Sequence, residues 1–412
     1  MIAVTESIDG VAPREAIEPS SADEMARTLA SASHHRASVV IRGGGTKIGW
    51  GRTPASIDIL LSTRRLDALV AHEYADLTAT VQAGARLNEV NRVLARHGQW
   101  IPIESAFDDS TIGGAIATND SGPLRHRYGT PRDLLIGIRL ALADGRLIKA
   151  GGNVVKNVAG YDVGRLMTGS HGSLAAIVSA TFKLMPLPAA SSTLVSTFQR
   201  ADALVAAFTA ITSSQLEAAA IEVRAGGPAR GPAREDVGSG SSRTYQLILK
   251  FESTPGALNA HVQQARGSID QATTDVITAE SETSLWHEHV RAPWTASGMV
   301  VRFAWLPASL GAVLAFIDDV RGSVEEIELI GRAALGSGLL RVAADAGMQR
   351  NIVERLRSRT DVFRHVVVLR ADAAVKQQID VWGSLGDAGS LGASVKHALD
   401  PTGILNAGRG PV

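Results

Sequence analysis

The 412-residue chain contains no cysteine. This absence excludes disulfides, thiolate metal sites, cysteinyl iron–sulfur clusters, cysteine nucleophiles and cysteinyl cofactor links. Redox chemistry in this chain would therefore need a cofactor that is held without thiols. Electrons that leave through an iron–sulfur cluster would need a second polypeptide to carry it.

The chain also lacks a net charge and long apolar runs. Its 41 Lys and Arg residues balance 41 Asp and Glu residues, so no overall field attracts nucleic acid or an anionic membrane surface. No segment supplies the roughly 18 uninterrupted apolar residues of a membrane-spanning helix, and residues 1–20 lack the apolar core of a signal peptide. We expect a cytoplasmic protein that binds no nucleic acid.

Hydrophobic residues make up 45% of the chain, which is enough to build two domains. In the first half, hydrophobic spacing and capping residues predict helices at 21–35 and 86–99 and strands at 39–42, 55–62 and 77–84. Asp144 and Gly145 predict a hairpin within 134–151. These elements indicate an α+β domain over residues 1–190, with subdomains at about 1–99 and 100–190.

The second half, residues 191–412, alternates between β-runs and helical runs. This alternation predicts a smaller, ferredoxin-like α+β lobe. The β-runs are 247–253, 299–307, 338–346 and 365–371, and the helical runs are 256–266, 309–322 and 349–359. Residues 224–243 are rich in Gly, Pro and Ser and are interpreted as a mobile insertion. No repeat of fixed period is visible.

Three glycine-rich segments are the candidate site. The first, VVIRGGGTKIGW (39–50), places Gly43, Gly44 and Gly45 after a predicted strand. Its spacing matches neither GxxxxGK[ST] nor GxGxxG. A glycine run in this position is more often a tight turn, and the alternative is a nest of backbone N–H groups that binds an anion.

Two later segments favour the anion site. STIGGAIATNDSG (110–122) combines a Gly pair, hydroxyl groups and Asn119, with apolar residues that indicate a partly buried path. TGSHGSLAAIV (168–178) again places glycines before an apolar strand. Three such segments in one chain point to a shared phosphate-binding role.

The order of these segments resembles the FAD-binding domain of the vanillyl-alcohol oxidase and p-cresol methylhydroxylase superfamily. The run GYDVGRLMTGSHGSLAAIVSATFKLMP (160–186) is similar to the GYDL and GSEGTLG signature of its 2-hydroxy-acid dehydrogenase branch. The tail SVKHALDPTGILNAGRG (394–410) resembles the DP and ILNPG ending of that branch. Within the branch, the pattern of residues 366–409 is most similar to FAD-binding subunits of glycolate oxidases.

The resemblance implies a two-subdomain p-cresol methylhydroxylase-type FAD-binding domain, followed by the ferredoxin-like lobe, with the C-terminal tail packing back on the FAD domain. It implies that FAD is held by backbone and hydroxyl groups, with charge from Arg42 and Lys47. Because the first loop carries Gly45 and the chain has no cysteine, we expect non-covalent FAD. The implied cofactor residues are Arg42, Gly43, Gly44, Gly45, Thr46, Lys47, Ser110, Gly113, Gly114, Thr118, Asn119, Gly122 and, through its backbone, Ile177.

The chain departs from the family where the catalytic groups are expected. Autonomous dehydrogenases of the branch carry a histidine-rich segment similar to GHAGDGNxH in the second lobe. The equivalent stretch here is GRAALGSGLLRV (331–342), which has neither histidine nor an acid. No catalytic residue and no metal site is therefore assigned.

For the remaining candidate histidines and arginines, we favour structural roles over catalytic ones. His287 and His289 would share a face on a strand, but we favour a surface helix with an aromatic anchor, since two ligands make a poor zinc site. Arg291 and Arg302 could bind a carboxylate, although contact with a partner or solvent is the more usual role. Local hydrogen bonding is favoured for Arg125 and His126, and a structural role for His171.

Three functions remain open. The first is the FAD-binding subunit of a glycolate oxidase complex, which the resemblance pairs with a catalytic FAD subunit and an iron–sulfur subunit. In this first function, the complex would attach to the inner membrane only through these partners. The small 2-hydroxy acid could bind at the partner's site. The second is a self-sufficient FAD-dependent dehydrogenase of the D-lactate type. The third is a non-catalytic scaffold that binds FAD weakly.

Overall fold

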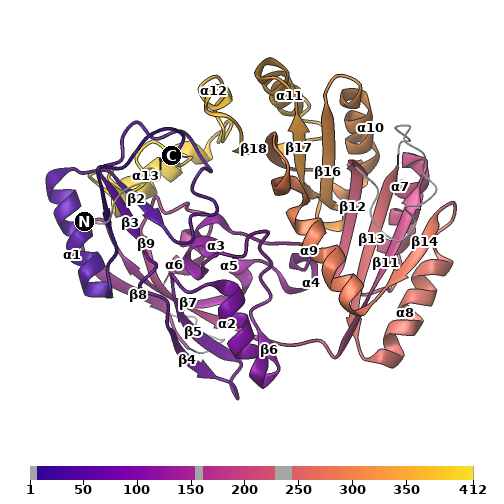
Figure 1. Cartoon of the computed structure of the whole chain (residues 1–412), viewed down its shortest axis with the longest axis horizontal. Helices are drawn as coiled ribbons and strands as arrows, with labels where there is room; N and C mark the ends of the chain where they lie inside the picture. The colour runs from indigo at the N-terminus through magenta and orange to yellow at the C-terminus, as the bar shows by residue number, and fades with distance from the viewer. Residues whose placement is uncertain (1–6, 154–160, 228–243, 412) are drawn as a thin grey trace. The chain divides into compact units, whose positions relative to one another are not determined.

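The computed structural model describes residues 7–153, 161–227 and 244–411 (Figure 1). The chain divides into two compact units. The first comprises Met1–Gly122, Tyr128–Leu187 and Ser384–Val412, and the second comprises Pro123–Arg127 and Pro188–Gly383. Most of the predicted insertion at 224–243 lies outside the described residues. None of the described helices is long and apolar enough to cross a membrane.

A small parallel sheet forms one part of the first unit. Its strand order is β1 (Glu15–Ile17), β3 (Ile59–Ser62), β2 (Val39–Arg42). Helix α1 (Ala22–His35) buries Met25 and Leu29 in the same core as Leu61. The Ser21 hydroxyl accepts from the Glu24 N–H and caps the helix, as the sequence predicts.

A five-stranded antiparallel sheet forms the other part. Its order is β4 (Leu69–Glu73), β5 (Thr78–Gln82), β9 (Ala176–Lys183), β7 (Leu135–Ala141), β8 (Leu147–Gly151). The predicted hairpin is confirmed, with Gly145 at φ +86° in the turn between β7 and β8. The helices of this part are α2 (Leu87–Leu94), α3 (Ile112–Thr118), α5 (Pro131–Leu134) and α6 (Val163–Met167).

The C-terminal tail returns to the first unit, which confirms that prediction. Helix α13 (Ala388–Leu399) precedes a segment in which Leu405 forms a parallel bridge with Val39 of β2. Ile404 and Leu405 are buried in the core beneath α1. In Figure 1 the yellow tail accordingly runs beside the indigo strand β2.

The second unit contains two ferredoxin-like motifs in one antiparallel sheet. The first motif is β11 (Ala190–Phe198), α7 (Ala201–Thr212), β12 (Ala220–Gly226), β13 (Tyr245–Ser253), α8 (Pro255–Gly267) and β14 (Thr273–Ile277). The second is β15 (Met299–Ala304), α10 (Leu310–Arg321), β16 (Glu326–Arg332), β17 (Ser337–Ala343), α11 (Ala346–Ser358) and β18 (Arg364–Arg370).

The strand order, β14-β11-β13-β12-β16-β17-β15-β18, shows that the motifs join edge to edge through β12 and β16. The predicted ferredoxin-like lobe is thus confirmed and present twice. The four predicted β-runs are β13, β15, β17 and β18, and the three predicted helices are α8, α10 and α11. The duplication was missed because the two copies share topology without a repeated sequence pattern.

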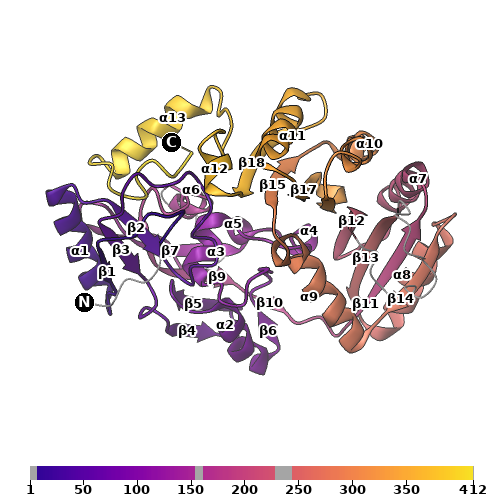
Figure 2. The same ribbon diagram turned by 45° about the horizontal axis from the view of Figure 1, so that its top comes forward.

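The two faces of this sheet bury different side chains. Val223 and Leu247 point into a large apolar core with α7, α8, α10 and α11. Helix α9 (Ala279–Thr295) lies on the opposite face, where its Trp286 packs against Val195 and Ile248 (Figure 2). Because side chains alternate along each strand, neighbouring residues supply both cores.

Helix α9 confirms the helical interpretation of LWHEHVRAPW, but its surface placement is wrong for one histidine. His287 is exposed, whereas His289 is only 1% exposed and its Nε2 lies 3.0 Å from Glu222 Oε2. Burial lowers the pKa of His289, and Arg224 and Arg332 add to this effect while Glu222 opposes it. Among the described residues, no group of three acids or histidines is placed to hold a metal.

The glycine loop depends on a close contact inside the first unit. A Cβ atom at Gly43 would lie 2.1 Å from Thr111 Oγ1, and one at Gly44 would lie 1.8 Å from the carbonyl oxygen of Asp109. Any larger residue would force these two segments apart. Gly49, in the same loop, faces open space.

We therefore expect Gly44→Ala to lower the free energy of unfolding by about 1–3 kcal/mol, as overpacking usually does. The matched control Gly49→Ala should change it by less than about 0.5 kcal/mol. Urea denaturation followed by circular dichroism makes the comparison. Equal effects of the two substitutions would contradict the packing described here.

The buried imidazole of His289 predicts an acid-sensitive second unit. Burial disfavours the charged imidazole of His289 in the folded protein, whereas unfolding restores an ordinary pKa of ~6.5, so the unfolded state binds more protons below that pH. The free energy of unfolding should then fall as the pH drops below about 6.5, by up to ~1.4 kcal/mol per pH unit.

His289→Gln should flatten this dependence, and the exposed control His287→Gln should not. Urea denaturation between pH 5 and pH 7.5 measures both slopes. The remaining slope of His289→Gln includes His126, whose pKa is also lowered by burial. A slope unchanged from that of the wild type would show that His289 does not titrate as argued.

Candidate functional site

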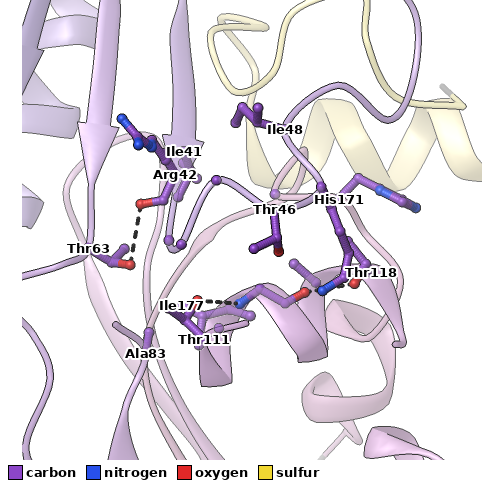
Figure 3. Close-up of a pocket in the computed structure, with 18 of the residues that line it drawn as sticks. Ile41, Arg42, Thr46, Ile48, Thr63, Ala83, Thr111, Thr118, His171 and Ile177 are labelled. Carbon is purple, nitrogen blue, oxygen red and sulfur yellow. Dashed lines mark hydrogen bonds between the residues drawn. The ribbon is translucent and has the colours of Figure 1, made fainter. Parts of the chain in front are cut away.

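The three glycine-rich segments meet at one pocket in the first unit, about 760 Å³ in volume with its open mouth included. Figure 3 shows Thr46 extending from the glycine loop toward α3, with Ile177 on the facing strand β9. The lining consists of residues 41–48, Trp50, Thr63, Ala83, Thr111, Gly113, Gly114, Ala117, Thr118, His171, Gly172, Ala175, Ile177, Asn406 and Arg409.

The glycine loop supplies free hydrogen-bond donors. Within the described residues, the backbone N–H groups of Gly43, Gly44, Gly45 and Thr46 meet no protein acceptor. All four residues line the pocket, and Gly45 has φ +80°. Successive N–H groups of this kind form a concave anion site.

Helix α3 arranges the second segment. The Thr111 hydroxyl caps it by accepting from the Gly114 N–H at 3.3 Å, and the Thr118 hydroxyl donates to the Gly114 carbonyl at 2.8 Å. Gly113 lies against Ala83, where a Cβ would come within 2.9 Å of the alanine methyl group. This contact brings α3 close to the end of β5.

Lys47 lines the pocket, but its charge is engaged within the protein. Its Nζ lies 2.7 Å from Asp120 Oδ2 and donates to Ser110 Oγ at 3.0 Å. The side chain is only 5% exposed, and Nζ also lies 5.3 Å from the centre of the Phe107 ring. Lys47 therefore joins the first and second segments, and Asp120 neutralises its charge.

Ten of the thirteen predicted cofactor residues line the pocket, and three do not. Ser110 is buried beneath Lys47. Gly122 is buried against Glu104, where a Cβ would lie 2.6 Å from the glutamate Cβ. Asn119 ends α3 in a left-handed conformation at φ 48°. The cofactor contacts of these three residues stay predictions.

Sequence reasoning missed the contribution of the tail. Asn406 and Arg409 line the pocket, although they lie more than 200 residues beyond the other segments. Burial lowers the pKa of Arg409, and Asp9 opposes that effect; an arginine nevertheless keeps its charge at neutral pH. The ILN and GR motifs of the tail were the sequence signal for this contribution. Their position at the pocket, however, depends on the pairing of Leu405 with Val39.

His171 joins the third segment to the tail. Its backbone adopts φ 53°, its N–H donates to Ala117 O at 2.7 Å, and its carbonyl accepts from Asn406 Nδ2. These backbone bonds agree with the structural role predicted for it. A left-handed conformation is uncommon outside glycine and asparagine.

The pocket suits a ligand that joins an anionic group to flat apolar rings. Unpaired N–H groups and Arg409 provide the anion-binding side, while Ile41, Ala175 and Ile177 provide apolar walls. FAD has this combination of pyrophosphate and ring systems. The residues present therefore fit FAD.

The comparison with protein families matches residues 13–151 to the FAD binding domain family. Subunit GlcD of glycolate oxidase from Bacillus subtilis is 35% identical over 51% of this chain and 45% of its own length. Subunit GlcE of glycolate oxidase from Escherichia coli is 34% identical over 38% of this chain and 45% of its own. The chain thus spans less than half the length of these relatives.

A longer match is D-2-hydroxyglutarate dehydrogenase from Xanthomonas citri, which is 26% identical over 95% of this chain and 88% of its own length. Among solved structures, an alkyldihydroxyacetonephosphate synthase superposes with a TM-score of 0.69 at 18% identity, covering 96% of this chain and 76% of the other. That likeness supports the fold alone. Taken with the pocket, the family match indicates that residues 13–151 belong to an FAD binding domain, with FAD as its cofactor.

Proposed function

We propose that the chain is the FAD-binding subunit of a glycolate oxidase complex, an FAD-dependent oxidoreductase of 2-hydroxy acids. The complex would oxidise glycolate to glyoxylate and pass the electrons to an iron–sulfur partner, and FAD bound to this chain would supply two-electron redox chemistry in support. The observation that carries the proposal is the row of unpaired N–H groups at residues 43–46 inside a partly apolar pocket.

The cofactor residues of the proposal are those that line the pocket. The N–H groups of residues 43–46 bind the pyrophosphate, and the Thr46 and Thr118 hydroxyls add hydrogen bonds. Arg42 and Arg409 supply positive charge, since the charge of Lys47 is neutralised by Asp120. Ile177 packs against a ring of the cofactor and offers its backbone to it.

The segment that replaces the histidine-rich motif has a packing role here. It forms the turn between β16 and β17, where a Cβ at Gly331 would lie 2.9 Å from the Trp305 ring and one at Gly338 would lie 3.1 Å from it. A metal-binding side chain at either glycine would displace Trp305. This supports a subunit that relies on a partner for the acid–base groups of the reaction.

The proposed partners are a catalytic FAD subunit and an iron–sulfur subunit. The relatives GlcD and GlcE, which are named as subunits of glycolate oxidase, support a partner flavoprotein. An iron–sulfur subunit is proposed because a chain without cysteine holds no cysteinyl iron–sulfur cluster. The small 2-hydroxy acid would bind at the partner's site. We propose a cytoplasmic complex that reaches the inner membrane through these partners.

The purified chain, loaded with FAD, should be yellow and show a flavin spectrum. Under anaerobic conditions, glycolate or D-lactate should leave that spectrum unchanged until the catalytic and iron–sulfur subunits are added. Absorption spectroscopy follows the bleaching, and dithionite serves as the control that the flavin can be reduced.

Two outcomes would overturn this assignment. Bleaching by glycolate or D-lactate without partners would make the chain a self-sufficient dehydrogenase, an alternative favoured by the long match to D-2-hydroxyglutarate dehydrogenase. Colourless protein that takes up no FAD would make it a scaffold.

The flavin should also be released by denaturation. No cysteine is present and the first loop carries no histidine, so no covalent link is expected there. Acid precipitation should leave the flavin in the supernatant, as measured by its fluorescence. Flavin that stays in the protein pellet would contradict non-covalent binding.

A further inference from the structure

The C-terminal tail is anchored by a buried ion pair next to the pocket. Lys396 Nζ contacts Asp400 Oδ2, and the side chain of Asp400 is fully buried. The same ammonium group donates to Ser173 O at 2.7 Å and to Leu405 O at 2.9 Å. One side chain of the tail thus binds both the third glycine segment and the end of the tail.

The Asp400 carboxylate fixes the turn that follows α13. It accepts from the Ile404 N–H at 3.1 Å and from the Leu405 N–H at 2.8 Å. The turn directs the chain onto β2, where Val39 N–H donates to Ile404 O and Asn406 N–H donates to Val39 O, both at 2.8 Å. The glycine loop begins directly after this strand.

Arg409 then ties the tail to the glycine loop. Its Nη2 donates to the carbonyls of Ile48 and Trp50, the latter at 3.1 Å, and its Nε donates to Arg52 O at 3.4 Å. Its Nη1 donates to Asn406 Oδ1 at 3.3 Å. A single buried guanidinium therefore holds three carbonyls of the loop that carries the unpaired N–H groups.

We propose that residues 396–409 form a strap whose docking and FAD binding are coupled, with Arg409 as the residue that positions the glycine loop. The strap closes the loop at residues 48–52 and, through Asn406 and Lys396, the loop at residues 171–173. Both loops line the pocket. If the strap were undocked, the backbone N–H groups of the glycine loop would therefore be misplaced for binding FAD. The inference concerns the cofactor alone and does not depend on the substrate.

Linkage makes the proposal reciprocal: if the strap strengthens FAD binding, FAD must stabilise the strap by the same factor. Hydrogen exchange of the wild-type protein tests this without any variant. Adding FAD to FAD-free protein should slow exchange in residues 404–406 by roughly 5- to 150-fold, the usual range of such coupling. Strand β13 of the second unit is the internal control and should exchange at the same rate in both states.

Substitution tests the converse. Arg409→Met should raise the dissociation constant for FAD by a similar factor, measured by quenching of flavin fluorescence. Arg409→Lys should also weaken FAD binding to a similar extent, because lysine keeps the charge but lacks the planar guanidinium group. Arg92→Met is the matched control, because Arg92 pairs with Glu89 on the exposed face of α2. Its dissociation constant should equal that of the wild type.

The outcomes separate coupling from general damage. Equal exchange of residues 404–406 with and without bound FAD would overturn the proposal, as would an unchanged dissociation constant in folded Arg409→Met. If Arg409→Met fails to fold, the wild-type exchange and Arg409→Lys decide the question. Failure of glycolate to bleach the flavin in the assembled complex would refute the proposed substrate and leave this test unaffected.

Discussion

The cofactor site depends on a contact that only glycine permits. At Gly43 and Gly44 the loop after β2 approaches the segment of Asp109 and Thr111 so closely that no Cβ atom fits. This approach brings α3, the loop and β9 around one pocket, and the N–H groups of residues 43–46 remain without protein acceptors within the described chain. The triple glycine is thus needed both for packing and for an open row of donors.

Charge is distributed around this pocket in an unexpected way. Lys47, which follows the glycine run by two residues, is neutralised by Asp120 and holds two segments together. A cation for the pocket comes instead from Arg409 in the tail. Backbone dipoles are fixed by the fold, so an anion site built mainly from them requires little rearrangement when the ligand binds.

The local parts of the fold and site could be predicted from the sequence, and the parts that depend on distant pairing could not. Ser21 caps α1, and Asp144 with Gly145 turns a hairpin, because such signals act within a few residues. The glycine segments were visible for the same reason. The place of Arg409 was not, because it follows from the pairing of Leu405 with Val39. The sequence predicted a surface position for His289, because hydrophobic spacing does not reveal that Glu222 on strand β12 contacts its ring.

The central claim is that backbone N–H groups of residues 43–46 hold the pyrophosphate of FAD. The most direct measurement is a crystal structure of the chain with FAD bound. The account predicts pyrophosphate oxygens within hydrogen-bond distance of at least two of these N–H groups, at about 2.7–3.2 Å. A pyrophosphate bound elsewhere, with these N–H groups facing solvent, would contradict it.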